Sequence, residues 1–267
     1  MARADQDKAR QFFKDIKSGP VAGVYLFHGD ERYLVERAID AVQKRVLGAD
    51  EDDDAFRMQK LRAGDVGAKT LIESARTVPM LGGQQMLVVR DCERFSDEEI
   101  AQLAEYAAKA SKRSCLVLCA NKVDGRKAGW KKLRSAACEV AFAPLYRNQM
   151  ADWIVRQAKL KKLAISAEAA DYLAEAVGTD MALADVALQK LALAESAEIS
   201  LETAKMLVAD TRERSVFELT DAISVRDTGT ALKALRNMLV HGAECLAIAF
   251  MLARHVRLLL KVKSGLD

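Results

Sequence analysis

The sequence has little net charge and few of the side chains that bind metals. Its 267 residues carry a formal charge of +3, so binding to nucleic acid or to a membrane would have to come from local patches. Three histidines and five irregularly spaced cysteines do not predict a metal site or a disulfide framework. Cys115 and Cys119 lie four residues apart in one apolar run, which predicts buried thiols on one face of a strand.

The sequence also lacks a long apolar run. No stretch approaches the ~20 residues that span a bilayer, and the first ten residues, MARADQDKAR, are polar rather than apolar as in a signal region. We therefore expect a cytoplasmic protein without a membrane partner. Its length predicts two or three domains.

Residues 1–145 alternate between short apolar runs and helical patterns. One helical pattern opens with Ser96 and Glu99, which have the spacing of a capping box. Alternation of this kind predicts an α/β domain with a five-stranded parallel sheet between two layers of helices. The strands are expected over residues 21–29, 55–63, 85–91, 115–121 and 138–144.

After Pro144 no strand pattern appears, and alanine- and leucine-rich helical patterns follow. We expect a small helical, lid-like domain over 146–211 and the start of a further helical domain over 212–267. The last helical run, 245–263, is apolar nearly all round, which predicts burial against several neighbours. We expect a partner subunit to cover it, or additional C-terminal sequence, or both.

A sheet followed by a small helical domain is the plan of AAA+ ATPases, but their phosphate loop, GxxxxGK[ST], is missing. The loop after the first strand, HGDERYL, has the single glycine Gly29 and two carboxylates that would repel phosphate. The stretch AGDVGAKT has alanine at both required glycine positions, and we expect Asp65 there to cap the next helix. The sequence thus predicts an AAA+/P-loop-like sheet without a functional P-loop, and no cofactor or metal.

A few polar residues stand where such ATPases place magnesium ligands and a sensor residue. Asp91 and Glu93 follow the third strand, and Asn121 follows the fourth. Without a phosphate loop they have no phosphate to serve, so the simpler interpretation is that loops begin there. Each of the three histidines, at 28, 241 and 255, is expected to be hydrogen-bonded or solvated. We predict a non-catalytic protein that works by contact.

One turn places two bulky apolar residues, Met80 and Leu81, between Pro79 and a double glycine. Proline and glycine disfavour regular structure on both sides of the pair. From the residues alone, the pair could fold back onto the sheet edge or contact a partner.

The chain resembles the delta subunit of bacterial DNA polymerase III, a clamp-loader subunit. The resemblance spreads over the whole chain rather than resting on one motif. It is carried by VYLFHGDERYLVERAIDAV, VPMLGGQQMLVVRD, LAEAVGTDMALADVALQKL, SVFELTDAISVRDTGTALKALRNMLVHG and LARHVRLLLKVK.

The resemblance implies a non-catalytic part of the DNA polymerase III holoenzyme, a DNA-directed DNA polymerase. Such a subunit binds and opens the beta sliding clamp, so that the clamp can be loaded on primed DNA during replication. The implied partners are that clamp, the tau/gamma and delta-prime subunits, and primed DNA. In the family two bulky apolar residues, often Leu-Phe, enter a pocket of the clamp; here they match Met80 and Leu81, flanked by Val78, Pro79 and Gly82.

A basic cluster in residues 125–135 allows two interpretations. It could contact DNA through Arg126, Lys127, Lys131 and Lys132. The simpler interpretation is a solvated helix face with Trp130 and Leu133 turned inward. Two other functions also stay open: a divergent ATPase, which nucleotide titration would reveal, and a nucleic-acid-binding adaptor, which would bind DNA without a clamp.

Overall fold

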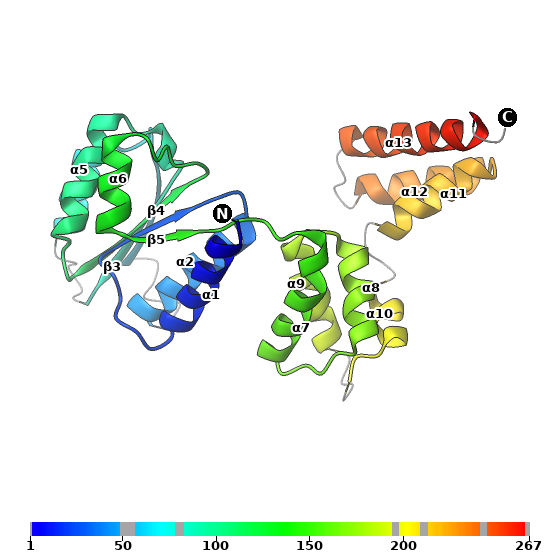
Figure 1. Cartoon of the computed structure of the whole chain (residues 1–267), viewed down its shortest axis with the longest axis horizontal. Helices are drawn as coiled ribbons and strands as arrows, with labels where there is room; N and C mark the ends of the chain where they lie inside the picture. Colours follow the sequence, from blue (N-terminus) through cyan, green and yellow to red (C-terminus); the bar gives the residue numbers. More distant parts are fainter. Residues whose placement is uncertain are drawn as a thin grey trace. The chain divides into compact units, whose positions relative to one another are not determined.

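The computed structural model describes residues 2–48, 57–77, 83–193, 198–208, 213–240 and 245–264 (Figure 1). The chain forms two compact units, Met1–Pro144 and Leu145–Asp267. The finer division of the second unit at residue 211 stays a prediction.

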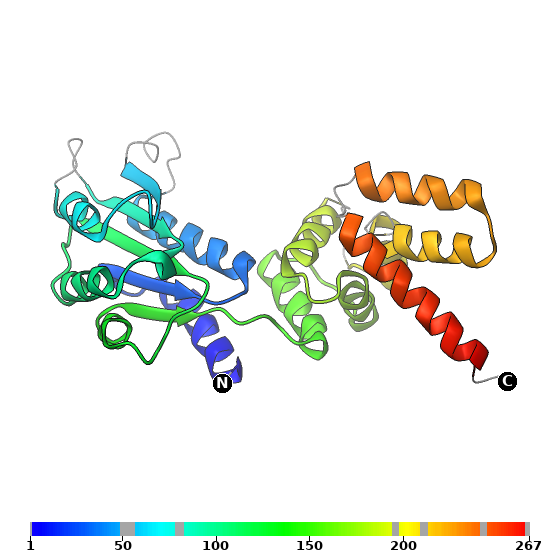
Figure 2. The ribbon, with the colours of Figure 1, turned by 90° about the horizontal axis from the view of Figure 1, so that it is seen from above.

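The first unit contains the predicted parallel sheet, whose order is β2-β3-β4-β1-β5 (Figure 2). All four strand pairings are parallel. The central strand β4 is buried at all seven positions, as expected for a strand covered on both faces. The strands are β1 (Val24–His28), β2 (Met58–Arg62), β3 (Gln85–Arg90), β4 (Ser114–Ala120) and β5 (Cys138–Ala141).

Helices cover both faces of this sheet, which makes the three predicted layers. Alternate strand residues such as Leu87 and Leu116 pack with α4 (Ala68–Arg76), α5 (Asp97–Ala108) and α6 (Ala128–Ala136). Their neighbours Val88 and Val117 point the other way and pack with α1 (Ala2–Asp15) and α2 (Arg32–Val46) (Figure 1). A short 3₁₀ helix, Cys92–Arg94, follows β3.

Cys115 and Cys119 lie in the layer that packs with α1 and α2, so the two thiols share one face as predicted. Burial raises the pKa of each thiol to about 12, because a thiolate would be poorly solvated there. Both are therefore protonated apolar packing groups at neutral pH.

The second unit is helical. After the 3₁₀ turn Arg147–Gln149, its first four helices are α7 (Met150–Leu160), α8 (Ala167–Val177), α9 (Met181–Ala192) and α10 (Leu201–Val208). The side chains of Ser166 and Asp180 cap α8 and α9 by accepting hydrogen bonds from the helices' first turns. Beyond Pro144 the described residues contain no strand, only the isolated bridge between Ile165 and Ile199.

The last three helices are α11 (Glu213–Ser224), α12 (Thr228–Val240) and α13 (Cys245–Ser264). They share a small core of Leu219, Ala234, Met238 and Ile248. In the part of the chain that the structure describes, α13 exposes Leu246, Phe250, Val256, Leu259 and Leu260, so its own neighbours do not bury it all round. The partner subunit or additional sequence that we expected to cover these residues stays a prediction. None of the helices that the structure describes is long and apolar enough to cross a membrane.

Candidate functional site

The loop after β1, which in AAA+ ATPases holds phosphate, is shaped here by a close contact with the residue after β5. Gly29 follows β1 with φ +123°, and a Cβ there would lie 2.2 Å from the carbonyl oxygen of Phe142. The glycine at this position therefore allows the chain to pass close to the residue after β5. The positive φ of Gly29 is thus explained by packing against the Phe142 backbone, without a role in phosphate binding.

A pocket of about 410 Å³ lies at this edge, where the strands end. An ion pair crosses its wall, because Arg90 on β3 donates to both carboxylate oxygens of Glu36 on α2, at 2.5 and 2.8 Å. These hydrogen bonds lower the pKa of Glu36, so the pair is charged at neutral pH. Glu36 and Asp91 offset two of the three arginines in the lining, which makes the pocket a poor cradle for a polyphosphate.

The polar residues after the third and fourth strands bind each other. Glu93 accepts hydrogen bonds from the Asn121 side-chain amide at 2.7 Å and from the Asn121 backbone N–H at 3.1 Å. Glu93 therefore joins the ends of two neighbouring strands. Within the described residues no three His, Cys, Asp or Glu side chains cluster closely enough to hold a metal ion.

The predicted partner-binding residues Val78, Pro79, Met80, Leu81 and Gly82 lie outside the described residues. The structure describes both flanks. On one side α4 ends at Arg76 and Thr77 follows; on the other, Gly83, with φ +74°, leads into β3. The structure therefore describes this candidate site only through its flanks, the end of α4 and the start of β3.

The start of α4 corrects one prediction. Asp65 does not cap the helix; its N-cap is Gly67, which has no side chain to do so. The cap comes from α5 instead, where Glu99 accepts a hydrogen bond from the Ala68 backbone N–H at 3.2 Å. The same carboxylate accepts bonds from the backbone N–H and hydroxyl of Ser96, each at 2.9 Å, in the predicted capping box.

The hydrogen bonds that Glu99 accepts also change its pKa. Backbone N–H bonds from Ser96 and Ala68 lower the pKa of Glu99, since they stabilise its charged form. One carboxylate thus ties the first turns of α4 and α5 together. The sequence pattern revealed only the local half of this contact, because Ala68 lies 31 residues away in the chain.

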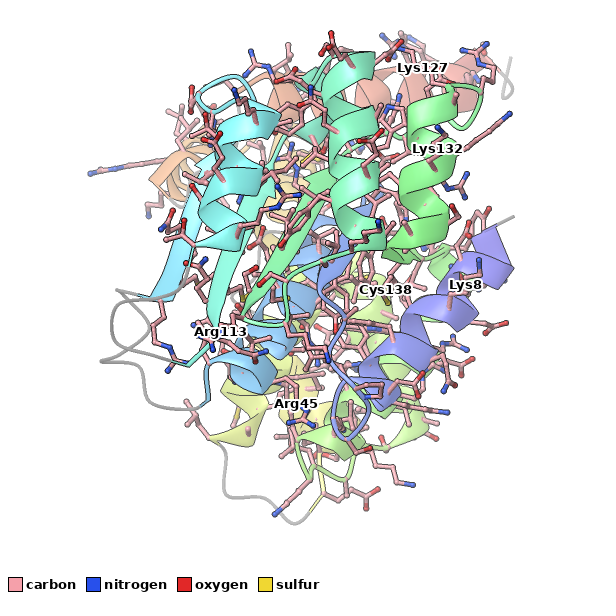
Figure 3. The ribbon with its side chains drawn as sticks, turned by 90° about the vertical axis from the view of Figure 1, so that its left-hand side faces the viewer. Lys8, Arg45, Arg113, Lys127, Lys132 and Cys138 are labelled. Carbon is pink, nitrogen blue, oxygen red and sulfur yellow. The ribbon has the colours of Figure 1, made fainter. Side chains whose placement is uncertain are left out.

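The basic helix α6 has the inward face that we expected, since Trp130 and Leu133 are buried. Of the possible DNA-contacting residues, Arg126 is paired with Asp124 and Lys127 with Asp97. Lys131 and Lys132 are exposed, and no described carboxylate lies within ion-pair distance of either. Lys127 lies at the N-terminal end of α6, and Lys132 lies on the helix itself (Figure 3).

His28 is hydrogen-bonded, as expected. Its Nε2 lies 2.9 Å from Oε1 of Glu139 on β5, the carboxylate that also accepts from Arg134 of α6. Although burial raises the pKa of Glu139, the bonds from Arg134 and His28 outweigh it and lower that pKa. These contacts join β1, the edge strand β5 and α6, and the cluster contains no nucleophile.

Fold and site together define a class: a protein with an AAA+-like α/β domain without a phosphate loop, followed by helical regions. The family described as DNA polymerase III, delta subunit, matches residues 25–143, and its C-terminal domain matches residues 213–266. This chain belongs to the DNA polymerase III delta subunit family.

Two matches to Bacillus subtilis proteins agree with this assignment. The chain is 26% identical over 263 residues to DNA polymerase III subunit delta of Bacillus subtilis (strain 168), covering 94% of this chain and 75% of the relative. The solved structure of the Bacillus subtilis DNA clamp loader delta protein (YqeN) matches with a TM-score of 0.71 at 25% identity, covering 96% of this chain and 79% of that one. The Thermotoga maritima branch migration motor RuvB is a weaker match, with a TM-score of 0.44 at 12% identity over 90% of this chain and 82% of RuvB.

Proposed function

We propose that this chain is the clamp-loader subunit that binds the beta sliding clamp and opens it, so that the ring can be loaded on primed DNA during replication. The observation that carries the proposal is membership of the delta subunit family. Two features support it. The phosphate loop is absent from the sequence, and the edge where nucleotide would bind is spanned by the Arg90–Glu36 pair.

In this proposal Met80 and Leu81 enter an apolar pocket of the clamp, with Val78, Pro79 and Gly82 shaping the turn that presents them. Each large apolar side chain that leaves water contributes about 1.5–3 kcal/mol, and such anchors are often binding hot spots. Methionine is flexible enough to fit a pocket that other members fill with a different pair.

Opening requires that the subunit bind an open or distorted ring better than a closed one, because binding energy shifts an equilibrium only by differential affinity. The helix α4 suits this role, since Glu99 holds its first turn and β3 and β4 hold its last. A helix fixed at both ends transmits a displacement instead of absorbing it.

The further partners belong to the same proposal. The exposed apolar residues of α13 would meet the tau/gamma and delta-prime subunits, because apolar patches of this kind mark interaction surfaces. The free lysines of α6 would lie near primed DNA. The chain itself would carry no catalytic step and would act in the cytoplasm.

Ring opening is tested with the cognate clamp labelled by two fluorophores across one subunit interface. We expect the purified chain to increase the distance between the labels without nucleotide. A chain that binds the clamp but leaves this distance unchanged would contradict the opening function while leaving clamp binding intact.

A further inference from the structure

The side chain of Gln85 joins the two flanks of residues 78–82. Gln85 is the first residue of β3, and its Nε2 donates to the carbonyl oxygens of Ser74 at 2.8 Å and Thr77 at 3.1 Å. Both acceptors lie in the last turn of α4 or directly after it. The Ser74 carbonyl also accepts from the Thr77 backbone N–H at 3.2 Å, so Gln85 adds a donor from β3 to this helix end. Most carbonyl groups at a helix end lack partners within the helix, so a donor from another element helps to fix where that end lies.

A second, buried contact holds the same helix end. The Ser114 hydroxyl of β4 donates to the Ala75 carbonyl oxygen, and the Tyr106 hydroxyl of α5 lies 3.1 Å from the Ser114 oxygen. Because the Ser114 proton is used on Ala75, Tyr106 is the donor in that pair. Ser114 and Tyr106 are each about 2% exposed. Water cannot readily replace these buried hydrogen bonds, so Tyr106 and Ser114 hold the Ala75 carbonyl group rigidly.

We propose that Gln85 is a positioning residue for clamp binding, with Ser114 fixing the helix end on which it acts. This inference rests on the proposed function. Gln85 holds Thr77 at a set distance from the start of β3, and the segment that carries Met80 and Leu81 begins at Thr77. Fixing the ends before the clamp arrives lowers the conformational entropy lost on binding.

The neighbouring residue provides a matched control. Gln84 has the same side chain, and its Nε2 donates at 2.8 Å to the Lys112 carbonyl oxygen, which precedes β4. Methionine has nearly the shape of glutamine but cannot donate a hydrogen bond. Gln85→Met and Gln84→Met therefore remove equivalent amides from adjacent positions, and only the first loosens α4.

The experiment measures affinity for the cognate clamp by surface plasmon resonance, with thermal unfolding of each variant alongside. We expect Gln85→Met to weaken binding about tenfold, the size of one or two lost hydrogen bonds, with Gln84→Met close to wild type. Ser114→Ala is the second variant and should weaken binding in the same direction.

A double-mutant cycle separates positioning from a general loss of structure. If Gln85 acts through the apolar pair, Gln85→Met should cost much less affinity when Leu81→Ala is already present. An equal loss in both backgrounds, or wild-type affinity of Gln85→Met, would overturn the inference. If Leu81→Ala alone binds as tightly as wild type, the proposed clamp contact of Leu81 fails instead.

Discussion

At the residue scale, the polar side chains in the first unit mostly join one element to another. Glu99 is the clearest case, since a single carboxylate caps its own helix and the start of α4. Four backbone N–H groups at each helix start lack partners within the helix, so one acceptor that serves two helices affects both.

We predict that Glu99→Ala lowers the free energy of unfolding by about 1–2 kcal/mol, the usual effect of losing a helix cap. Glu98→Ala is the control, because Glu98 lies in the same turn of α5 and its side chain makes no hydrogen bond to the described residues. Urea unfolding of both variants measures the difference. Equal unfolding free energies for the two variants would contradict the double cap.

The same cap predicts a pH dependence. Since the folded protein lowers the pKa of Glu99 below the ordinary value of 4.5, its contribution is present above that pH and is lost as the pH falls through the lowered pKa. The stability gap between wild type and Glu99→Ala should therefore shrink during acidification below about pH 4.5. A gap that stays constant from pH 7 to pH 3 would rule out the charge as its cause.

The residue scale also shows where sequence reasoning stops. The spacing of Ser96 and Glu99 predicted a capping box, and the structure confirms it. The prediction for Asp65 failed because the acceptor for the next helix comes from a residue distant in the chain, which no local pattern contains. Gln85 and Ser114 were missed for the same reason.

At the element scale, β1, β3 and β4 were predictable because they are nearly continuous apolar runs, as burial on both faces requires. Helix α1 was missed, although its Ala9 and Phe12 and the Ile16 that follows it have helical spacing and are buried. Phe12 packs edge-on against Phe27 of β1, with ring centroids 5.3 Å apart. This contact shows that the spacing of apolar residues marked a helix that packs on the sheet.

The lysines of α6 allow a test at this scale. If Lys131 and Lys132 contact phosphates, the double variant Lys131→Ala/Lys132→Ala should weaken binding of the assembled clamp loader to primed DNA. The slope of log affinity against log salt should fall by about 2, roughly 0.9 per lost phosphate contact. Fluorescence anisotropy at several salt concentrations measures both quantities.

The control removes the same charge from another helix, through the exposed Lys8 and Lys14 of α1. It should leave the salt slope near that of wild type. An unchanged slope in the α6 variant would instead support a solvated helix face without a DNA contact.

At the scale of the whole molecule, the sequence patterns predicted the fold in more detail than the function. Alternating apolar and helical patterns lead to the α/β unit, and the missing phosphate loop argues for function by contact. The identity of the contact residues depends on the shape of a partner, which no pattern in this chain encodes. The assignment of Met80 and Leu81 therefore rests on the family, and the structure adds how the ends of their segment are held.

The most direct test of the account is the affinity of the Met80→Ala/Leu81→Ala variant for the cognate sliding clamp, measured by calorimetric titration. The control is Met206→Ala/Leu193→Ala, which removes the same side chains from exposed positions of the second unit. We predict that the first variant binds at least about 100-fold more weakly than wild type, with unfolding unchanged, because two anchors are lost. The control should bind like wild type. Wild-type affinity of the Met80→Ala/Leu81→Ala variant would contradict the account.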